Sequence, residues 1–375
     1  MLLIEADGKA LLRQRGVPVP DSTEARGPVE ALPGQGPWLV KAQVPVGGRG
    51  KAGGIVRCIS LDEVNATLQR LLGTRMKGHV VESCLIETAA SGTERYLSIM
   101  VDAPSYGLRV MYAAEGGVEI EQSDTVQGLV CPPHPSAVEQ ALDELLQGEP
   151  IAWRGQVARI GRQLASLLLD RELALAEINP LFVAETGCVA ADAKIVVDLN
   201  AIGRQPDIAA FIARRPTVYV DANRKLAEGF DYVELDAEGE IGLVTTGAGL
   251  SMMLIDELTQ RGAKPLNFCD IRTGQMRGSP ARLIRVLEWI TSHASLKAVL
   301  VNIFAGITDL SEFAGLLAAA IKASPALKVP VVARLVGRNA AEARQILNEA
   351  QPGMLVTEDL NEALARLDAI VGARG

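Results

Sequence analysis

Along its last 140 or so residues, the chain alternates short apolar runs with segments in which apolar residues recur every three or four positions. This pattern predicts strands at 241–246, 265–269, 298–304, 329–335 and 354–356, and helices at 250–261, 279–293, about 310–323, 339–350 and 360–372. Strands that are apolar throughout and alternate with amphipathic helices are typical of a parallel, doubly wound α/β sheet.

The first two-thirds of the chain has shorter and more mixed periods. Helices are predicted over 1–16, from Ser60 to about 73, over 137–147 and over 152–169, and strands at 38–44, 55–59, 80–86, 96–101 and 106–113. Ser60 and Glu63 have the spacing of a capping box, which marks a helix start. Residues about 204–236 carry charges and weak periodicity, and are predicted to connect the two parts.

A glycine-rich segment, GGRGKAGG at residues 47–54, lies between the first two of these strands. It contains the dinucleotide-binding pattern G-x-G-x-x-G, but that fingerprint requires a helix directly after the glycines, and here a strand follows. The order favours a hairpin whose tip can fold over nucleotide phosphates, with Arg49 and Lys51 adding positive charge. An ordinary flexible hairpin is an equally good interpretation of this stretch alone.

A second hairpin is predicted over residues 173–192. Glu177 and Asn179 lie two residues apart on one strand and therefore share a face. If the turn is centred between Glu185 and Thr186, Asn179 lies opposite Asp192. Two carboxylates and an amide oxygen then converge, and oxygen ligands of this kind suit Mg²⁺ carried on nucleotide phosphates. A solvent-facing polar stripe is the alternative interpretation.

Composition limits the class of protein. The 375 residues suffice for two or three domains, and 48% hydrophobic with 22% charged residues is typical of a soluble globular protein. A net charge of −8 argues against a nucleic-acid binder. The five cysteines are far apart, which indicates neither a zinc site nor a disulfide framework. With no apolar stretch long enough for a membrane span, we expect a cytoplasmic protein that binds neither membrane nor nucleic acid.

Six ordered motifs resemble the β subunit of succinyl-CoA synthetase and its relatives, which include malate–CoA ligase and part of ATP-citrate lyase. The motifs are VKAQV at 40–44, GGRGKAGG at 47–54, EGGVEIE at 115–121, EINPL at 177–181, GAGL at 247–250 and VNIFAGI at 301–307. The resemblance implies an ATP-grasp nucleotide-binding domain, predicted for residues 1–225. A flavodoxin-like CoA-ligase domain with a doubly wound parallel sheet is predicted for residues 236–375.

The resemblance also implies roles for individual residues. The nucleotide is expected to contact Lys41, Gly48, Arg49, Gly50, Glu87, Ala90 and Glu94. Mg²⁺ is expected on Asn179 and Asp192, whereas Glu177, which resembles the carboxylate that stabilises a phosphohistidine, and Arg49 are the expected catalytic residues. The acid substrate is expected near Thr246, Arg272, Gly306, Ile307 and Thr308.

The family's reaction joins a carboxylic acid to CoA while ATP is cleaved to ADP and phosphate, through a phosphorylated histidine. The histidines of this chain are His79, His134 and His293, and none lies in a glycine-rich loop of catalytic appearance. The family places the phosphohistidine and most of the CoA site on an α subunit. We therefore expect a heterodimer or heterotetramer with such a partner, with ATP, CoA and a small acid as substrates and Mg²⁺ as cofactor.

Three other functions are open at this point. They are a NAD-dependent enzyme, a non-catalytic regulatory subunit and a stand-alone ATP-grasp carboxylate ligase. The strand after the glycines argues against the first, and the retained Lys41, Glu177, Asn179 and Asp192 argue against the second. The C-terminal doubly wound domain argues against the third.

Two departures from the family pattern lie near the expected acid site. Thr246 stands where the family usually has asparagine, and the segment DIRTGQMRG at 270–278 replaces a glycine triplet. Arg272 favours bidentate contact with an oxyanion. One hypothesis is that the substrate is a small anionic acid other than succinate, such as a substituted dicarboxylate or a sulfonated acid. The alternative is that Arg272 only packs on the partner or replaces a lost contact.

Overall fold

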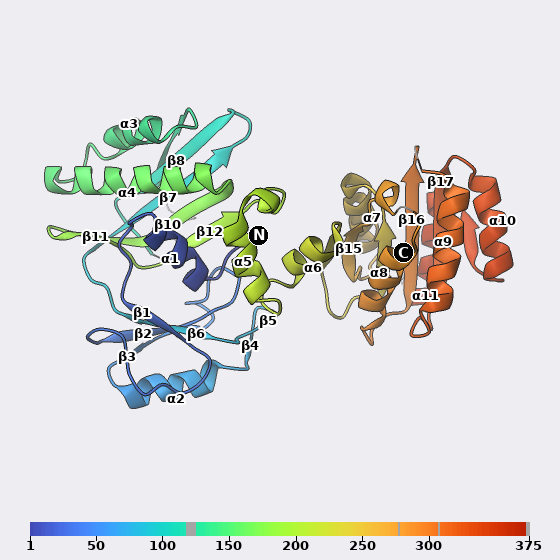
Figure 1. The fold of residues 1–375 in the computed structure, drawn as a ribbon, viewed down its shortest axis with the longest axis horizontal. Helices are drawn as coiled ribbons and strands as arrows, with labels where there is room; N and C mark the ends of the chain where they lie inside the picture. The colour runs from blue at the N-terminus through green and yellow to red at the C-terminus, as the bar shows by residue number, and fades with distance from the viewer. Residues whose placement is uncertain (118–124, 277, 307, 373–375) are drawn as a thin grey trace. The chain divides into compact units, whose positions relative to one another are not determined.

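The computed structural model describes residues 1–117, 125–276, 278–306 and 308–372 (Figure 1). The chain divides into two compact units, Met1–Tyr219 and Val220–Gly375. Each unit is an α/β assembly with its own sheets and its own core.

The first unit contains a four-stranded antiparallel sheet in the order β1-β6-β2-β3. Its strands are β1 (Ser22–Ala25), β2 (Trp38–Ala42), β3 (Ile55–Cys58) and β6 (Cys84–Thr88). Helix α2 (Leu61–Leu71) packs Val64 and Leu68 against Val40 and Ile86 of the sheet. The predicted helix start at Ser60 is confirmed, since Ser60 Oγ accepts a hydrogen bond from Glu63 N; the Glu63 carboxylate reaches back to Ile59 N, one residue before the position that a capping box uses.

A second, larger antiparallel sheet of this unit follows the order β11-β10-β7-β8-β9, and β12 also pairs with β10. Its strands are β7 (Thr93–Asp102), β8 (Gly107–Ala113), β9 (Gln127–Cys131), β10 (Leu173–Ala184), β11 (Gly187–Ala190) and β12 (Lys194–Val197). Helices α3 (Pro135–Leu145) and α4 (Ile151–Asp170) lie side by side and cover one face of it (Figure 1). Buried residues such as Val157, Leu164 and Leu168 form the apolar stripe of α4.

The rest of the first unit consists of short elements and the N-terminal helix. They are α1 (Glu5–Gln14), the strand pair β4 (Arg75–Met76) and β5 (His79–Val80), the 3₁₀ turn Ile202–Arg204 and α5 (Pro206–Arg214). The predicted strand 80–86 is therefore interrupted, because β5 ends at Val80 and β6 begins at Cys84. Helix α1 packs Leu11 and Leu12 into the interior.

The second unit is built on a parallel sheet in the order β14-β16-β17-β18. Its strands are β14 (Ile241–Thr245), β16 (Ala298–Ala305), β17 (Val331–Gly337) and β18 (Leu355–Thr357). One face is covered by α8 (Ala281–Thr291), α9 (Leu310–Ala323) and α10 (Ala340–Ala350), and the other by α7 (Ala248–Gln260) and α11 (Leu360–Val371). Helices on both faces of a parallel sheet confirm the predicted doubly wound arrangement.

Strand β15 (Asn267–Asp270) lies on the outer side of β14 and pairs with β13 (Asp231–Glu234) on its own outer side. The Asn267 side chain joins β15 to β14 by donating to Leu243 O and accepting from Leu243 N, both at 2.9 Å. With β15 included, the strand order is the flavodoxin-like 2-1-3-4-5, which reverses between β14 and β16.

The segment 204–236, predicted as a connection, contains regular structure. Besides α5, it holds α6 (Val220–Glu228) and β13, and the last two belong to the second unit. Among the residues that the structure describes, no helix is both long and apolar enough to cross a membrane.

Candidate functional site

The glycine-rich segment is the tip of the β2–β3 hairpin, in which Lys41 lies opposite Ile55. The predicted order of strand, glycine-rich turn, strand and helix is confirmed. Gly48 has φ +70°, a left-handed conformation that favours glycine, and both Gly48 and Gly50 are exposed. Arg49 between them is buried, so its side chain turns inward instead of extending from the tip.

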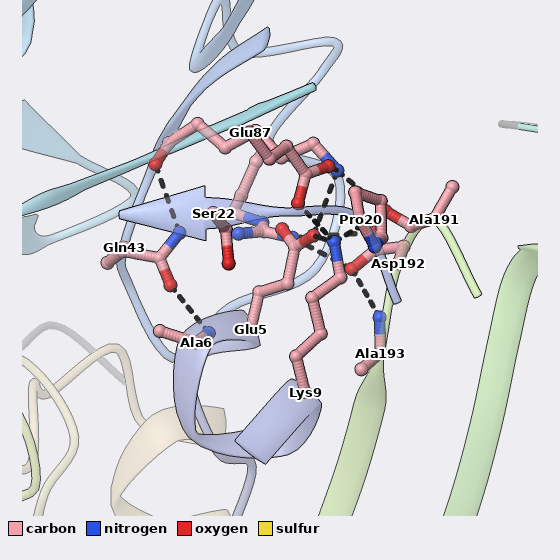
Figure 2. Close-up of polar contacts among 12 residues, drawn as sticks. Glu5, Ala6, Lys9, Pro20, Ser22, Gln43, Glu87, Ala191, Asp192 and Ala193 are labelled. Atoms are coloured by element: carbon pink, nitrogen blue, oxygen red, sulfur yellow. Dashed lines mark hydrogen bonds and ion pairs between the residues drawn. The ribbon is translucent and has the colours of Figure 1, made fainter. Parts of the chain in front are cut away.

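Beneath this hairpin lies a buried cluster of charges, which we call the α1 charge cluster: Glu5, Lys9, Lys41, Arg49, Glu87 and Asp192. Figure 2 shows Glu5 and Lys9 reaching from α1 toward Glu87 and Ala191. The first five residues are each at most 8% exposed, and Asp192 has a 30% exposed side chain. Buried charges of this number require close partners, and each has at least one.

Lys41 and Arg49 both bind the carboxylate of Glu5. Lys41 Nζ lies 2.8 Å from Glu5 Oε1 and 2.5 Å from Glu87 Oε1, and Arg49 Nη2 lies 2.6 Å from Glu5 Oε2. Arg49 Nη2 also donates to Asp192 Oδ1 at 3.2 Å. Arg49, expected at the nucleotide phosphates, thus meets Asp192, expected at the metal, although 143 positions separate them in the sequence.

These pairings determine the ionisation of the cluster. Burial alone would raise the pKa of Glu5, but the charges of Lys41, Lys9 and Arg49 hold that pKa well below its ordinary value. Burial would lower the pKa of Lys41, and the charges of Glu5 and Glu87 raise it instead. Glu5 and Lys41 are therefore both ionised at neutral pH.

The predicted hairpin over 173–192 has the expected register. Ala184 pairs with Gly187 across a turn at Glu185 and Thr186, and from Leu175 to Ala184 the pairs of β10 with β12 and β11 follow the same register. Residues 191–193 interrupt this ladder opposite residues 178–180, between the pairs Leu181–Ala190 and Glu177–Lys194. Asn179 and Asp192 are the central residues of the two facing interruptions.

The expected metal ligands differ in their partners. Asp192 accepts from Arg49 and from the backbone N–H of Ala193 at 2.7 Å. The Asn179 amide exchanges two hydrogen bonds with Gly117, accepting from its N at 2.8 Å and donating to its O at 2.9 Å. Among the described residues, no group of three or more His, Cys, Asp and Glu side chains is placed to hold a metal ion.

Glu177 lies beside the same interruption but outside the α1 charge cluster. Its Oε2 accepts from the Tyr96 hydroxyl at 3.3 Å and lies 3.6 Å from Lys194 Nζ. Its side chain is 12% exposed. The carboxylate is thus held by an aromatic hydroxyl and a cation on neighbouring strands.

The other residues expected to contact the nucleotide, Glu87, Ala90 and Glu94, differ in their surroundings. Glu87 is fully buried on β6, where it pairs with Lys9 and Lys41. Ala90 is half-buried just after β6, and Glu94 is exposed on β7. Their role at the nucleotide stays a prediction. Of the motif at 115–121, residues 118–121 lie outside the described residues.

In the second unit, a cavity of about 340 Å³ opens at the carboxyl ends of β14 and β16. Its lining includes Thr246, Arg272, Gln275, Phe304, Gly306 and Thr308. The cavity lies where the strand order reverses, which is the usual ligand position on an open α/β sheet, and its volume suits a small molecule. Four residues expected at the acid are therefore brought together, and the fifth, Ile307, lies outside the described residues.

Arg272 does not reach into this cavity as an isolated charge. It has φ +51°, and its Nη2 donates to Asp231 Oδ2 at 2.7 Å, while Lys225 Nζ lies 2.7 Å from the other oxygen. The side chain is 38% exposed. The hydroxyl groups of Thr273 and Thr308, which both line the cavity, form a hydrogen bond of 2.9 Å. The guanidinium of Arg272 has five N–H donors, and Asp231 accepts from one edge of it, so other donors are available for a ligand.

Sequence reasoning missed Glu5, Lys9, Asp231 and Phe304. Glu5 and Lys9 are four residues apart on α1 and share a face that also carries buried apolar residues. Charged residues on the buried face of a helix were the available signal. Phe304, 58% exposed at the cavity, departs from the buried pattern of β16.

Two family comparisons agree with this architecture. Residues 2–183 match the ATP-grasp domain family, and residues 244–370 match the CoA-ligase family. The fold and the family matches therefore define a ligase in which an ATP-grasp domain precedes a CoA-ligase domain. The predicted domain bounds, 1–225 and 236–375, stay a prediction.

The chain belongs to the family of ADP-forming succinate–CoA ligase β subunits. It is 38% identical to the member from Chloroflexus aurantiacus, over 97% of this chain and 98% of the relative. It is 33% identical to the member from Stenotrophomonas maltophilia, over 97% of each. The ATP citrate lyase of Methanothrix soehngenii shares the fold, with a TM-score of 0.74, 16% identity and 99% coverage of both chains.

Proposed function

We propose that the chain is the ATP-binding β subunit of an ADP-forming ligase that joins a small anionic carboxylic acid to CoA. The observation that carries the proposal is the meeting of Lys41, Arg49 and Asp192 in one buried cluster. These residues come from separate motifs, and each is of the type that binds phosphate or its metal. Family membership supports the same activity.

The chemistry explains why ATP is needed. A free carboxylate is a poor electrophile, and phosphorylation gives it a leaving group. In the proposed reaction a histidine nitrogen takes the γ-phosphoryl group of ATP and ADP leaves. A carboxylate oxygen of the acid then attacks the phosphorus, and the CoA thiol attacks the resulting acyl carbon and releases phosphate. This chain contributes positioning and charge neutralisation by Lys41, Arg49 and the backbone N–H groups of the glycine-rich tip.

Mg²⁺ fits the residues at the interrupted ladder. Asp192 supplies a carboxylate and Asn179 an amide oxygen, and hard oxygen ligands of this kind suit Mg²⁺ that is held mainly by nucleotide phosphates. The ion would neutralise phosphate charge. Glu177, held by Tyr96 and Lys194, is the carboxylate proposed to face the phosphohistidine.

The histidine is proposed to belong to an α subunit. His134 caps α3 and contacts Ser136. His293 lies against Ala237 O and Glu234. His79 is exposed on the short strand β5. These surroundings support structural or surface roles for the three histidines. The phosphohistidine is therefore proposed to lie on an α subunit that assembles with this chain as a heterodimer or heterotetramer. Five buried free thiols support a reducing compartment such as the cytoplasm.

The acid is proposed to occupy the cavity of the second unit, with Arg272 beside its second anionic group. A substituted dicarboxylate or a sulfonated acid fits a site that presents a guanidinium, hydroxyls and the phenyl ring of Phe304. The alternative, in which Arg272 only replaces a lost contact, is supported by its pairing with Asp231. Variants at both positions separate these proposals, as described in the Discussion.

The proposed division of labour can be tested by phosphoryl transfer. The chain and its α partner are incubated with γ-labelled ATP and Mg²⁺, and the label on each subunit is measured. We expect label on a histidine of the partner, strongly reduced by Lys41→Met and unchanged by Lys322→Met, an exposed lysine in the last turn of α9. Label on this chain, or none on either, would contradict the proposal.

A further inference from the structure

Three protein oxygens surround the ammonium group of Lys41. Lys41 donates hydrogen bonds to Glu5 Oε1 at 2.8 Å and to the carbonyl oxygen of Ala191 at 2.7 Å, and its Nζ lies 2.5 Å from Glu87 Oε1. A nucleotide phosphate that binds Lys41 must therefore compete with these oxygens.

Lys9 repeats this set of partners. Its Nζ lies 2.6 Å from Glu5 Oε1, 2.5 Å from Glu87 Oε2 and 2.8 Å from the same Ala191 oxygen. The two lysines thus share two carboxylates and one carbonyl, and Figure 2 shows Lys9 beside Glu5, Glu87 and Ala191. Lys9 is 1% exposed. A cation at this depth does not contact a ligand directly, but its charge and its shared partners can act on the site.

Glu5 forms ion pairs with both Lys41 and Arg49, the two cations that are proposed to bind the nucleotide phosphates. One of its oxygens binds Lys41 and the other binds Arg49 at 2.6 Å, and its side chain is fully buried. Counted as ionised groups, the α1 charge cluster has three cations and three carboxylates. The cluster is balanced without a ligand, so incoming phosphates compete with the carboxylates of the protein.

We propose that Glu5 and Lys9 are positioning residues that set the affinity of the nucleotide site in opposite directions. Glu5 lowers the affinity because it holds Lys41 and Arg49 away from phosphate. Lys9 raises the affinity because it draws Glu5 and Glu87 partly off Lys41. This inference rests on the proposed function, in which Lys41 and Arg49 bind the phosphates.

The test measures binding of a non-hydrolysable ATP analogue to the whole chain in the presence of Mg²⁺, by calorimetry. Glu5→Gln keeps the side-chain shape and removes one negative charge, so the analogue should bind about tenfold more tightly, near the lower end for close charge pairs. Lys9→Met leaves both carboxylates to Lys41, so the analogue should bind about tenfold more weakly.

Asp7→Asn is a matched control on the same helix. Asp7 is also buried, but its partners are Arg215 at 2.9 Å and the Tyr219 hydroxyl at 2.8 Å, outside the α1 charge cluster. Asp7→Asn should lower the melting temperature, because it removes a buried ion pair. It should leave the affinity for the ATP analogue within about twofold, because it changes no partner of Lys41.

The two single variants each leave a buried charge unbalanced. The double variant Glu5→Gln/Lys9→Met restores the balance, and its affinity should fall between those of the single variants. It provides the measurement if a single variant does not fold.

Opposite shifts for the two single variants, with the double variant between them, support the inference. Weaker binding for both single variants, or no change in either, overturns it, because a merely structural role would disturb the site in the same sense. An unmodified chain that fails to bind the analogue would instead overturn the proposed function.

Discussion

Replacing Arg272 by alanine tests the proposed acid site. Arg272 Nη2 donates to Asp231 at 2.7 Å, and Arg272 is one of the residues that line the cavity. A hydrogen bond to a charged group contributes about 1.5–3 kcal/mol. Because the Arg272 side chain is 38% exposed, we take the lower end of about 1.5 kcal/mol, which corresponds to about tenfold in kcat/KM.

The assay compares two acids of equal length, one with a second anionic group and one without, by following ADP release. Arg272→Ala should lower kcat/KM about tenfold for the dianionic acid, change it less than about threefold for the monoanionic acid, and leave the KM for ATP unchanged. Equal changes for both acids would refute the reasoning.

Asp231→Asn is the matched variant. It removes the carboxylate but leaves the guanidinium at the cavity, so it should retain activity toward the dianionic acid. If Asp231→Asn and Arg272→Ala instead cause the same loss, the two residues act only as a structural pair. That result would support the alternative role of Arg272.

Two further predictions concern stability. Asn267→Leu should lower the free energy of unfolding by about 2–4 kcal/mol, measured by urea denaturation, because Leu243 N and O lose their partner inside the core; a loss below about 1 kcal/mol would contradict this role. Burial would raise the pKa of Asp231, but hydrogen bonds from Lys225 and Arg272 hold it below its ordinary value. A lowered pKa contributes stability that is present above about pH 4 and is lost as pH falls through the folded pKa, so Asp231→Asn should lower the melting temperature at pH 7 and have a progressively smaller effect as pH falls below about 4.

Most helices and strands could be predicted from the local pattern of hydrophobic and polar residues. The parallel strands of the second unit are apolar throughout and bounded by helices, and the hairpin register followed from the position of its turn. Both depend on neighbours in sequence. The order of strand, glycine-rich turn, strand and helix was predictable for the same reason.

The ion pairs of the two sites could not be predicted from the sequence, because they depend on which distant segments of the chain meet. Lys41 meets Glu87 because β2 and β6 are adjacent in the sheet, and it meets Glu5 because α1 brings that carboxylate to within 2.8 Å of Lys41 Nζ. Arg272 meets Asp231 because β13 pairs with β15. Strand β13 lies in the segment 204–236, which was predicted only as a connection. Periodicity carries no information on such pairings.

The Asn179 amide shows the same limit. Register placed it opposite Asp192, but its hydrogen bonds go to Gly117, which follows strand β8 in the sequence. The pairing of β10 with β7 shifts between Ile178 and Leu181, so the backbone is irregular at this residue on both sides. An irregularity of this kind has no signature in the alternation of polar and apolar residues.

The most direct test of the central claim measures ADP release by this chain together with its α partner. Mg-ATP, CoA and a panel of small carboxylic and sulfonated acids are supplied, and the chain alone is the control. The account predicts turnover that requires the partner, CoA and one anionic acid together. Turnover by the chain alone, or ADP release that no acid and no CoA stimulates, would contradict it.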